Sequence, residues 1–217
     1  MIAANMRRIL AEIPSGVKLV VVAKGRQPAE VVEAVNEGAS VIGENYVQEA
    51  DEIQRKIGCS VQWHFIGHLQ RNKIKRATEL FDMVQTVDSV ETAREIDRRC
   101  SAAGKVLPVL VEVNSAREPQ KSGLNPEAVD GAITEMVVLH NIRICGLMTM
   151  GPDRIRAEEL APYFRTTRML FDSLARRGGP NVEMKYLSMG MSTSYQVAIS
   201  EGANMVRLGR AIFGDRN

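Results

Sequence analysis

Short apolar runs alternate with longer segments of helical periodicity along the whole chain. The runs are rich in Val, Ile and Leu, and this alternation is typical of βα units around a parallel sheet. We expect strands at residues 18–24, 40–45, 61–67, 83–88, 106–114, 142–150, 184–190 and 204–209.

The segments between the runs carry apolar residues at every third or fourth position, so each would bury one face of a helix. They span residues 28–39, 45–57, 72–81, 89–104, 125–140, 156–178 and 193–203, after a short amphipathic helix within residues 1–14. Asp88 or Ser89 can cap the fourth of them, and Gly38 and Gly104 can end helices in a left-handed turn.

Eight such units without a break in composition predict one closed (β/α)₈ barrel of the TIM type. This α/β fold would occupy residues 1–217 as a single domain, with the short N-terminal helix as an addition. An open, doubly wound sheet is the alternative architecture.

Mostly polar residues stand at the carboxyl ends of the predicted strands, where barrels of this class place their chemistry. These positions are Lys24, Glu44, Asn45, Gly67, His68, Asp88, Asn114, Met150, residues 188–192, Arg207 and Gly209. Lys24 follows the buried run LVVVA. A solvated side chain is the ordinary interpretation, but the position of Lys24 at this end of its strand is one where a barrel presents functional groups.

The last two units supply the segments SMGMSTS (188–194) and VRLGRAIFG (206–214). Loops after the last two strands of a barrel often bind phosphate, because glycine lets backbone amides approach and a helix N-terminus adds a favourable dipole. The hydroxyl of Ser192 and the amides of Gly209 and Arg210 can donate hydrogen bonds there. Tight turns at the barrel rim are the alternative interpretation.

A lysine that faces such a phosphate cradle suits a phosphorylated aldehyde held as a Schiff base, and pyridoxal 5′-phosphate (PLP) is such a compound. Arg207 would then lie near the pyridine nitrogen. Because arginine stays protonated, that nitrogen would stay unprotonated and the ring would be a weaker electron sink. A salt bridge at the rim is the other interpretation of Arg207.

Seven motifs resemble, in order and over nearly the whole chain, those of the pyridoxal phosphate homeostasis protein family. They are LVVVAKG (19–25), IGENYVQE (42–49), WHFIGHLQRNK (63–73), KSG (121–123), GLMTM (146–150), SMGMS (188–192) and MVRLGRAIFG (205–214). The resemblance implies a PLP-binding barrel of fold type III, similar to the N-terminal domain of alanine racemase. It also implies a protein that holds PLP as a Schiff base, takes part in intracellular vitamin B6 homeostasis, and passes PLP to apoenzymes without being an enzyme.

The family's functional residues carry over to matching positions of this chain. The resemblance implies that PLP is covalent on Lys24, with Ser192, Gly209 and Arg210 at its phosphate, Arg207 beside its ring nitrogen, and Asn45 near it. The chain departs from the family at four places. Ala23 and Gly25 replace the usual Ser and Thr around the lysine, and Thr193 and Ser194 replace acidic residues.

Two enzymes remain as alternatives: a PLP-dependent amino-acid racemase, and a barrel enzyme that uses Lys24 for a sugar or keto-acid Schiff base. Racemisation needs a second acid–base group opposite the lysine. The four tyrosines are poor candidates, because Tyr163 lies in an outer helix, Tyr186 lies mid-strand, and Tyr46 and Tyr195 begin helices, where we expect them to pack.

Composition excludes several other classes. Hydrophobic residues make up 45% and charged residues 25% of the 217, as in ordinary globular proteins, and the net charge of +2 does not favour nucleic acid or an acidic membrane. The basic run RNKIKR (71–76) is better read as a solvated helix face. No apolar run approaches the roughly 20 residues of a membrane helix, and we expect the first 14 residues to form a short amphipathic helix without a cleavable export signal. We expect a cytoplasmic monomer.

Cysteine and histidine predict no disulfide framework and no metal site. Cys59, Cys100 and Cys145 are odd in number and far apart, so we expect reduced, mostly buried thiols. His64 and His68 straddle a predicted strand and its loop, and no HExxH glutamate accompanies them. We expect His68 to form a polar wall of the barrel mouth.

Overall fold

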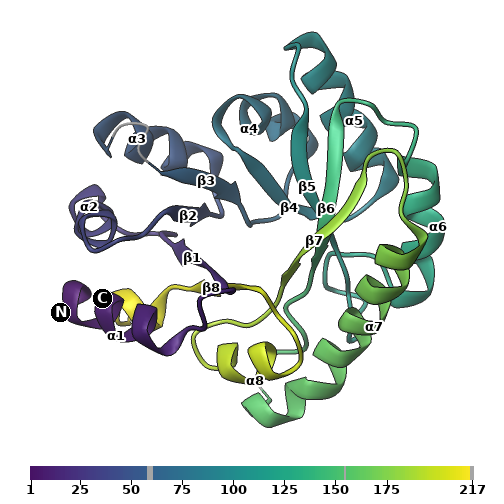
Figure 1. Cartoon of the computed structure of the whole chain (residues 1–217). Coiled ribbons are helices and arrows are strands. Elements are labelled where there is room, and N and C mark those ends of the chain that lie inside the picture. The colour runs from purple at the N-terminus through teal and green to yellow at the C-terminus, as the bar shows by residue number, and fades with distance from the viewer. Residues whose placement is uncertain (58–60, 154, 216–217) are drawn as a thin grey trace.

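Eight parallel strands form a closed barrel in the computed structural model, which describes residues 1–57, 61–153 and 155–215. The strands follow one another around the barrel in sequence order, and the last pairs with the first through Val20 and Arg207 (Figure 1). The predicted TIM-type (β/α)₈ barrel is therefore confirmed, and the open doubly wound sheet is excluded.

Each predicted strand boundary lies within two residues of the observed one. The strands are β1 (Lys18–Val22), β2 (Val41–Glu44), β3 (Gln62–Phe65), β4 (Met83–Val87), β5 (Leu107–Glu112), β6 (Ile142–Met148), β7 (Val182–Ser188) and β8 (Met205–Leu208). Most of the polar residues predicted at strand ends therefore stand in the turns just beyond the strands.

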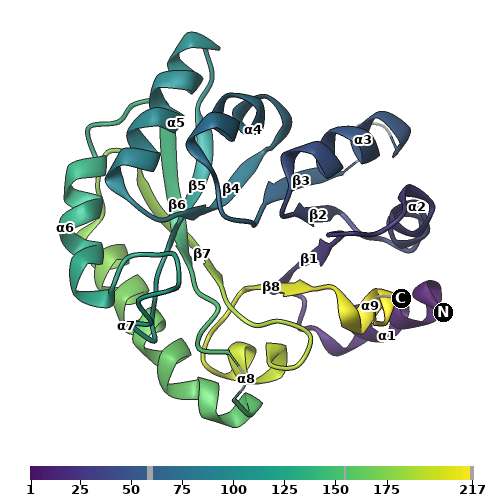
Figure 2. The same ribbon diagram turned by 180° about the vertical axis from the view of Figure 1, so that it is seen from behind.

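Helices surround the barrel as an outer ring (Figure 1). They are α1 (Ile2–Glu12), α2 (Pro28–Asn36), α3 (Val47–Ile57), α4 (Ile74–Leu80), α5 (Val90–Ala102), α6 (Pro126–Met136), α7 (Ala161–Arg177), α8 (Tyr195–Ser200) and α9 (Arg210–Phe213). Short 3₁₀ turns, η1 (Arg71–Lys73) and η2 (Ala157–Leu160), precede α4 and α7. Seen from behind, α1 and α9 lie side by side (Figure 2).

Capping residues begin and end the helices as predicted. Ser89 precedes α5 and its side chain accepts the amide of Thr92, which satisfies one of the free donors of the first turn. Gly38 and Gly104 follow α2 and α5 with φ values of 101° and 64°, a conformation that favours glycine.

Apolar side chains fill two layers. One lies between the strands and the helices, and a smaller cluster, which includes Val20, Val41 and Leu110, lies inside the barrel. Cys100 and Cys145 are buried free thiols as expected, whereas Cys59 lies outside the described residues.

A register shift between β6 and β7 depends on one glycine. Gly146 has a φ of 146°, and a Cβ there would lie 1.8 Å from the carbonyl oxygen of Tyr186. Only glycine allows this approach of the two strands. After the shift, Met148 of β6 pairs with Ser188 of β7, and Thr149 follows at the barrel mouth.

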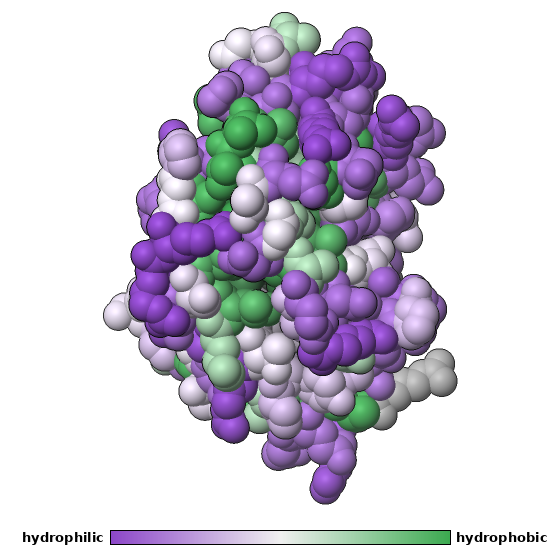
Figure 3. Space-filling model, turned by 90° about the vertical axis from the view of Figure 1, so that its right-hand side faces the viewer, coloured by the Kyte–Doolittle hydropathy of each residue, from purple (hydrophilic) through white to green (hydrophobic). Residues whose placement is uncertain are grey.

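The side of the molecule formed by the outer helices is mostly hydrophilic, with a band of apolar groups between the charged side chains (Figure 3). Exposed apolar residues of this outer layer include Met169 on α7 and Val138 in the turn after α6. Within the described residues, we find no helix with the length and apolar character needed to cross a lipid bilayer.

Candidate functional site

A cavity of about 470 Å³ lies at the carboxyl ends of β1 to β3. The turns after these strands form its wall, with Lys24, Asn45, Tyr46 and His68 among the lining residues. Two of the six predicted site residues therefore share this cavity. The other four lie outside its lining, on β8, in the turns after β7 and β8, and at the start of the last helix, α9.

Lys24 stands in the turn after β1, two residues beyond the last strand residue, Val22. Gly25 shapes this turn with a φ of 67°, and its amide donates to Oε2 of Glu49 at 2.8 Å. Nζ of Lys24 lies 5.1 Å from the centroid of the Tyr46 ring. The partly buried amine is thus presented at the cavity wall, over an aromatic face.

Tyr46 corrects one expectation. We expected it to pack as the first residue of a helix, but α3 begins only at Val47, and the Tyr46 side chain is 49% exposed beside Lys24. A residue in the turn before a helix is not bound to the buried helix face, which explains the error. Tyr195 does pack: it is buried at the start of α8, and its hydroxyl donates to Glu12.

Ser192 joins the loop after β7 to the turn after β8. Its Oγ accepts the amides of Gly209 at 3.3 Å and of Ala211 at 3.1 Å. Gly209 packs against β1, since a Cβ there would lie 3.4 Å from the carbonyl oxygen of Val22. The residues predicted to bind phosphate are therefore brought together, beside the strand that leads to Lys24.

Two donors among these residues remain available. The Ser192 hydroxyl accepts two amides and donates to no acceptor among the described residues, and the amide of Arg210 has no partner there either. A hydroxyl with both acceptor positions filled still has its hydrogen to donate. Converging donors of this kind suit an anion such as phosphate.

Arg207 lies inside the barrel with a side chain that is only 5% exposed. Its Nη1 donates to the carbonyl and Oγ of Ser188 at 2.9 and 2.6 Å, and its Nη2 donates to the carbonyl of Thr149 at 3.0 Å. These are bonds to the barrel wall and not a salt bridge at the rim. Within the described chain Nε has no partner and Nη2 makes only one bond, so each keeps an N–H that is available to a ligand.

Burial lowers the pKa of Arg207 to about 10, with Glu112 opposing the change. The guanidinium is therefore charged at neutral pH. Burial also raises the pKa of Glu112, at the end of β5, to about 7, with Asp88 adding to the effect and Arg207 opposing it. The barrel mouth holds a fixed cation beside a carboxyl group that titrates near neutrality.

Hydrogen bonds continue from Arg207 into the barrel. Oγ of Ser188 donates to Oε1 of Gln85 at 2.7 Å, and Nε2 of Gln85 lies 2.8 Å from Nδ1 of His64. Burial, with a smaller effect of Lys18, lowers the pKa of His64 to about 3, so the ring is neutral and its Nδ1 accepts. His64 thus orients the wall that holds the Arg207 guanidinium.

His68 stands apart from His64, at the mouth of the barrel. Its Nδ1 lies 3.2 Å from Oγ of Ser122 and 3.6 Å from Oδ2 of Asp88. These three residues do not form a hydrolase triad, because both partners approach the same ring nitrogen. In the described ranges there is no group of three or more His, Cys, Asp or Glu placed to hold a metal ion.

Glu44 is a buried carboxyl group to which the sequence interpretation gave no role. It ends β2, its Oε2 accepts the amide of Asn45 at 3.0 Å, and its Oε1 has no partner among the described residues. Burial, with a smaller effect of Glu49, raises the pKa of Glu44 to about 8. The sequence did hold a signal for such a buried carboxyl group, namely a glutamate at the end of an apolar run. Glu112, at the end of β5, carries the same signal.

The grouped residues have a clear chemical capacity. An amine, a set of anion donors and a buried guanidinium surround the carboxyl end of one barrel, from β1, β7 and β8. An amine can bind a carbonyl carbon, and the donors can hold a phosphate. The site suits a small phosphorylated carbonyl compound.

Comparison with known proteins gives one family by sequence and by structure. The family model described as "Alanine racemase, N-terminal domain" matches residues 1–217. A pyridoxal phosphate homeostasis protein of Aquifex aeolicus is 38% identical over 200 residues, which cover 92% of this chain and 87% of the relative.

Two solved structures of PipY from Synechococcus elongatus, one without PLP and one with PLP bound, have similar folds. Their TM-scores are 0.93 and 0.91 at 31% and 30% identity, and each alignment covers 99% of this chain and 100% of PipY. The chain belongs to the pyridoxal phosphate homeostasis protein family, within the wider family of alanine racemase N-terminal domains.

Proposed function

We propose that this protein binds PLP at the carboxyl end of its barrel and takes part in vitamin B6 homeostasis. It holds the reactive aldehyde in a protected form, as a monomer, and releases PLP to apoenzymes. The PLP-bound structure of PipY and the name of the Aquifex relative support the proposal. The observation that carries it is the placement of a set of anion donors against the strand that leads to Lys24.

The residues present fit the functional groups of PLP. PLP supplies an aldehyde carbon, with which an amine nitrogen forms a C=N bond as one water leaves. In our proposal Nζ of Lys24 is that amine, the Ser192 hydroxyl and the Arg210 amide bind the phosphate, and Nε of Arg207 donates to the ring nitrogen. Gly209 keeps side-chain atoms out of the cradle, and Asn45 lines the cavity wall.

A carrier without catalytic turnover agrees best with the tyrosine positions. A racemase needs groups on both faces of the substrate α-carbon. The ring of Tyr46 lies against Lys24 itself, and the Tyr195 hydroxyl is engaged with Glu12. Tyr163 lies in α7, and Tyr186 lines a cavity at the opposite end of the barrel. None of them faces Lys24 from across the site.

We therefore expect no efficient racemase activity. The PLP-loaded protein would be incubated with L- and D-alanine and with L- and D-serine in deuterated water, and α-proton exchange followed by NMR. Exchange should stay far below the median enzyme turnover of about 10 s⁻¹. Turnover near that value, lost in both Lys24→Ala and Tyr46→Phe, would replace the carrier proposal with an enzyme that uses Tyr46 as its second acid–base group.

Replacing Ser192 with alanine should weaken PLP binding by roughly one to two orders of magnitude, because one hydrogen bond to a charged group contributes about 1.5–3 kcal/mol. Pyridoxal, which lacks the phosphate, should be affected far less. Fluorescence titration of both ligands measures the difference, with Ser101→Ala on the exposed face of α5 as the matched control. Equal weakening of the two ligands would show that Ser192 does not meet the phosphate.

A further inference from the structure

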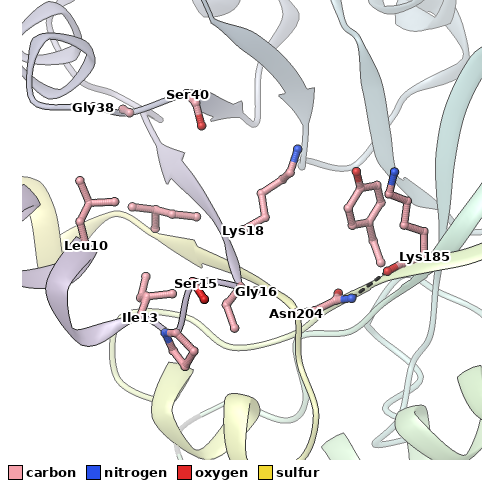
Figure 4. A pocket seen from close by; sticks show the side chains of 14 residues that line it. Leu10, Ile13, Ser15, Gly16, Lys18, Gly38, Ser40, Lys185 and Asn204 are labelled. Carbon is pink, nitrogen blue, oxygen red and sulfur yellow. Dashed lines mark hydrogen bonds between the residues drawn. The ribbon is translucent and has the colours of Figure 1, made fainter.

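A larger cavity, of about 590 Å³, lies at the opposite end of the barrel, where the strands begin (Figure 4). Its wall comes from the end of α1, the segment that leads into β1, the start of β1, the turn before β2, the middle of β7 and the residue that precedes β8. The volume is within the range of small-molecule sites. None of the residues assigned above to PLP lines this cavity.

One wall of the cavity is apolar. It is formed by α1, the start of β1 and the turn before β2, with the side chains of Leu10, Ile13, Val17, Leu19 and Ala39. Leu10, on the amphipathic helix α1, is 43% exposed beside the cavity. This wall can cover the apolar part of a ligand.

The facing wall is cationic. Lys18 from β1 and Lys185 from β7, the lysine pair, each place Nζ 5.4 Å from the centroid of the Tyr186 ring. Figure 4 shows the two side chains extending in the same direction from their strands. Nζ of Lys18 donates to Oε1 of Gln62 at 3.3 Å, and in the part of the chain that the structure describes neither ammonium has a carboxylate partner.

Charges around the lysine pair leave an excess of positive charge. An adjoining cavity of about 160 Å³ shares the pair and adds Arg143, Asp82 and Glu183 to the lining. Asp82 already accepts the amide of Trp63 at 2.8 Å through its Oδ2. Three cations therefore face two carboxylates, one of which is engaged with the backbone.

We infer that this cavity binds a phosphate monoester with a small apolar body. A phosphate monoester carries a charge of about −1.5 to −2 near pH 7, which the two ammonium groups of the lysine pair match. The phenol of Tyr186 lies between the pair and can donate as well. The apolar wall around Leu10 and Ile13 holds the body of the ligand, which distinguishes a monoester from free phosphate.

Phenyl phosphate is the probe that tests the inference. It would be titrated by calorimetry at low salt into protein whose bound PLP has been fixed by borohydride and from which excess PLP has been removed. The carboxyl end of the barrel is then occupied, and the second cavity is free of PLP. We expect a dissociation constant between about 10 μM and 1 mM, as for a small ligand with one charged group. Phenol and inorganic phosphate should each bind at least tenfold more weakly, because each meets only one wall.

Two variants locate the binding. Lys18→Gln and Lys185→Gln should each weaken phenyl phosphate at least tenfold, and the exposed position of Lys185 makes its variant safe for folding. Lys75→Gln, at an exposed lysine of α4, is the control and should change nothing. Amide NMR shifts should appear at Gly16 and Gly38, not at Gly190 and Gly209.

Absence of saturable heat, or equal weakening in all three variants, would overturn the inference. Shifts confined to the carboxyl end of the barrel would also overturn it, since the phosphate would then compete for the PLP site. Absorbance of bound PLP is recorded on the same samples. A failure of the proposed PLP function is thereby seen separately from a failure of this second site.

Discussion

Replacing Lys24 with alanine is expected to abolish the covalent PLP complex while leaving the fold intact. Lys24 stands in a turn beyond β1, partly exposed, so its side chain contributes little to packing. It supplies the amine that we propose for the covalent bond. The wild-type protein loaded with PLP should be yellow, and the Lys24→Ala variant should show only the spectrum of noncovalent PLP.

Borohydride reduction and peptide mapping provide the second readout. In the wild type the pyridoxyl group should map to Lys24, and the variant should carry no stoichiometric label. Lys73→Ala is a matched control, because Lys73 lines the same cavity and should be dispensable for the bond. A label on Lys73 in the wild type, or a full covalent spectrum in Lys24→Ala, would refute the assignment.

Replacing Glu44 with glutamine should make the protein more stable than the wild type at alkaline pH, by about 2–4 kcal/mol, because each pKa unit corresponds to about 1.4 kcal/mol. Burial raises the pKa of Glu44 from 4.5 to about 8. The folded state therefore binds a proton that the unfolded state releases near pH 4.5. The resulting stabilisation is present below pH 4.5 and is lost as the pH rises through about 8.

Urea unfolding of PLP-free protein at about pH 5, 7 and 8.5 measures this effect. Glutamine resembles the protonated acid in shape and cannot ionise, so the unfolding free energy of Glu44→Gln should fall less over this range. The exposed Glu158, changed to glutamine, is the control and should follow the wild type. Parallel curves for the wild type and Glu44→Gln would mean that Glu44 is ionised in the folded protein at neutral pH.

The barrel could be predicted from sequence because its signals are local. Each strand is a short apolar run, each helix repeats its apolar residues with its own period, and caps such as Ser89 act within one turn. Eight repeats of this pattern then leave few architectures open. The short helix α9 escaped notice because four residues are too few to show a helical period.

The position of the site also followed from sequence, since parallel strands in a barrel bring all their carboxyl ends together. The sequence alone therefore placed Lys24, Ser192 and Gly209 at the carboxyl end of the barrel. The contacts among them could not be predicted. That Ser192 accepts the Gly209 amide, and that the Tyr46 ring lies over Lys24, depends on turn conformations that no periodic pattern encodes.

Sequence by itself thus determined the order of the elements and the end of the barrel at which the chemistry lies. Tertiary structure alone decided which ionisable groups are perturbed and which distant residues share a cavity. Glu44 and Glu112 have raised pKa values because packing from several elements removes water from their carboxyl groups. Lys18 and Lys185 face one cavity because closure of the barrel brings the start of β1 near the middle of β7. Desolvation and proximity arise only from that closure.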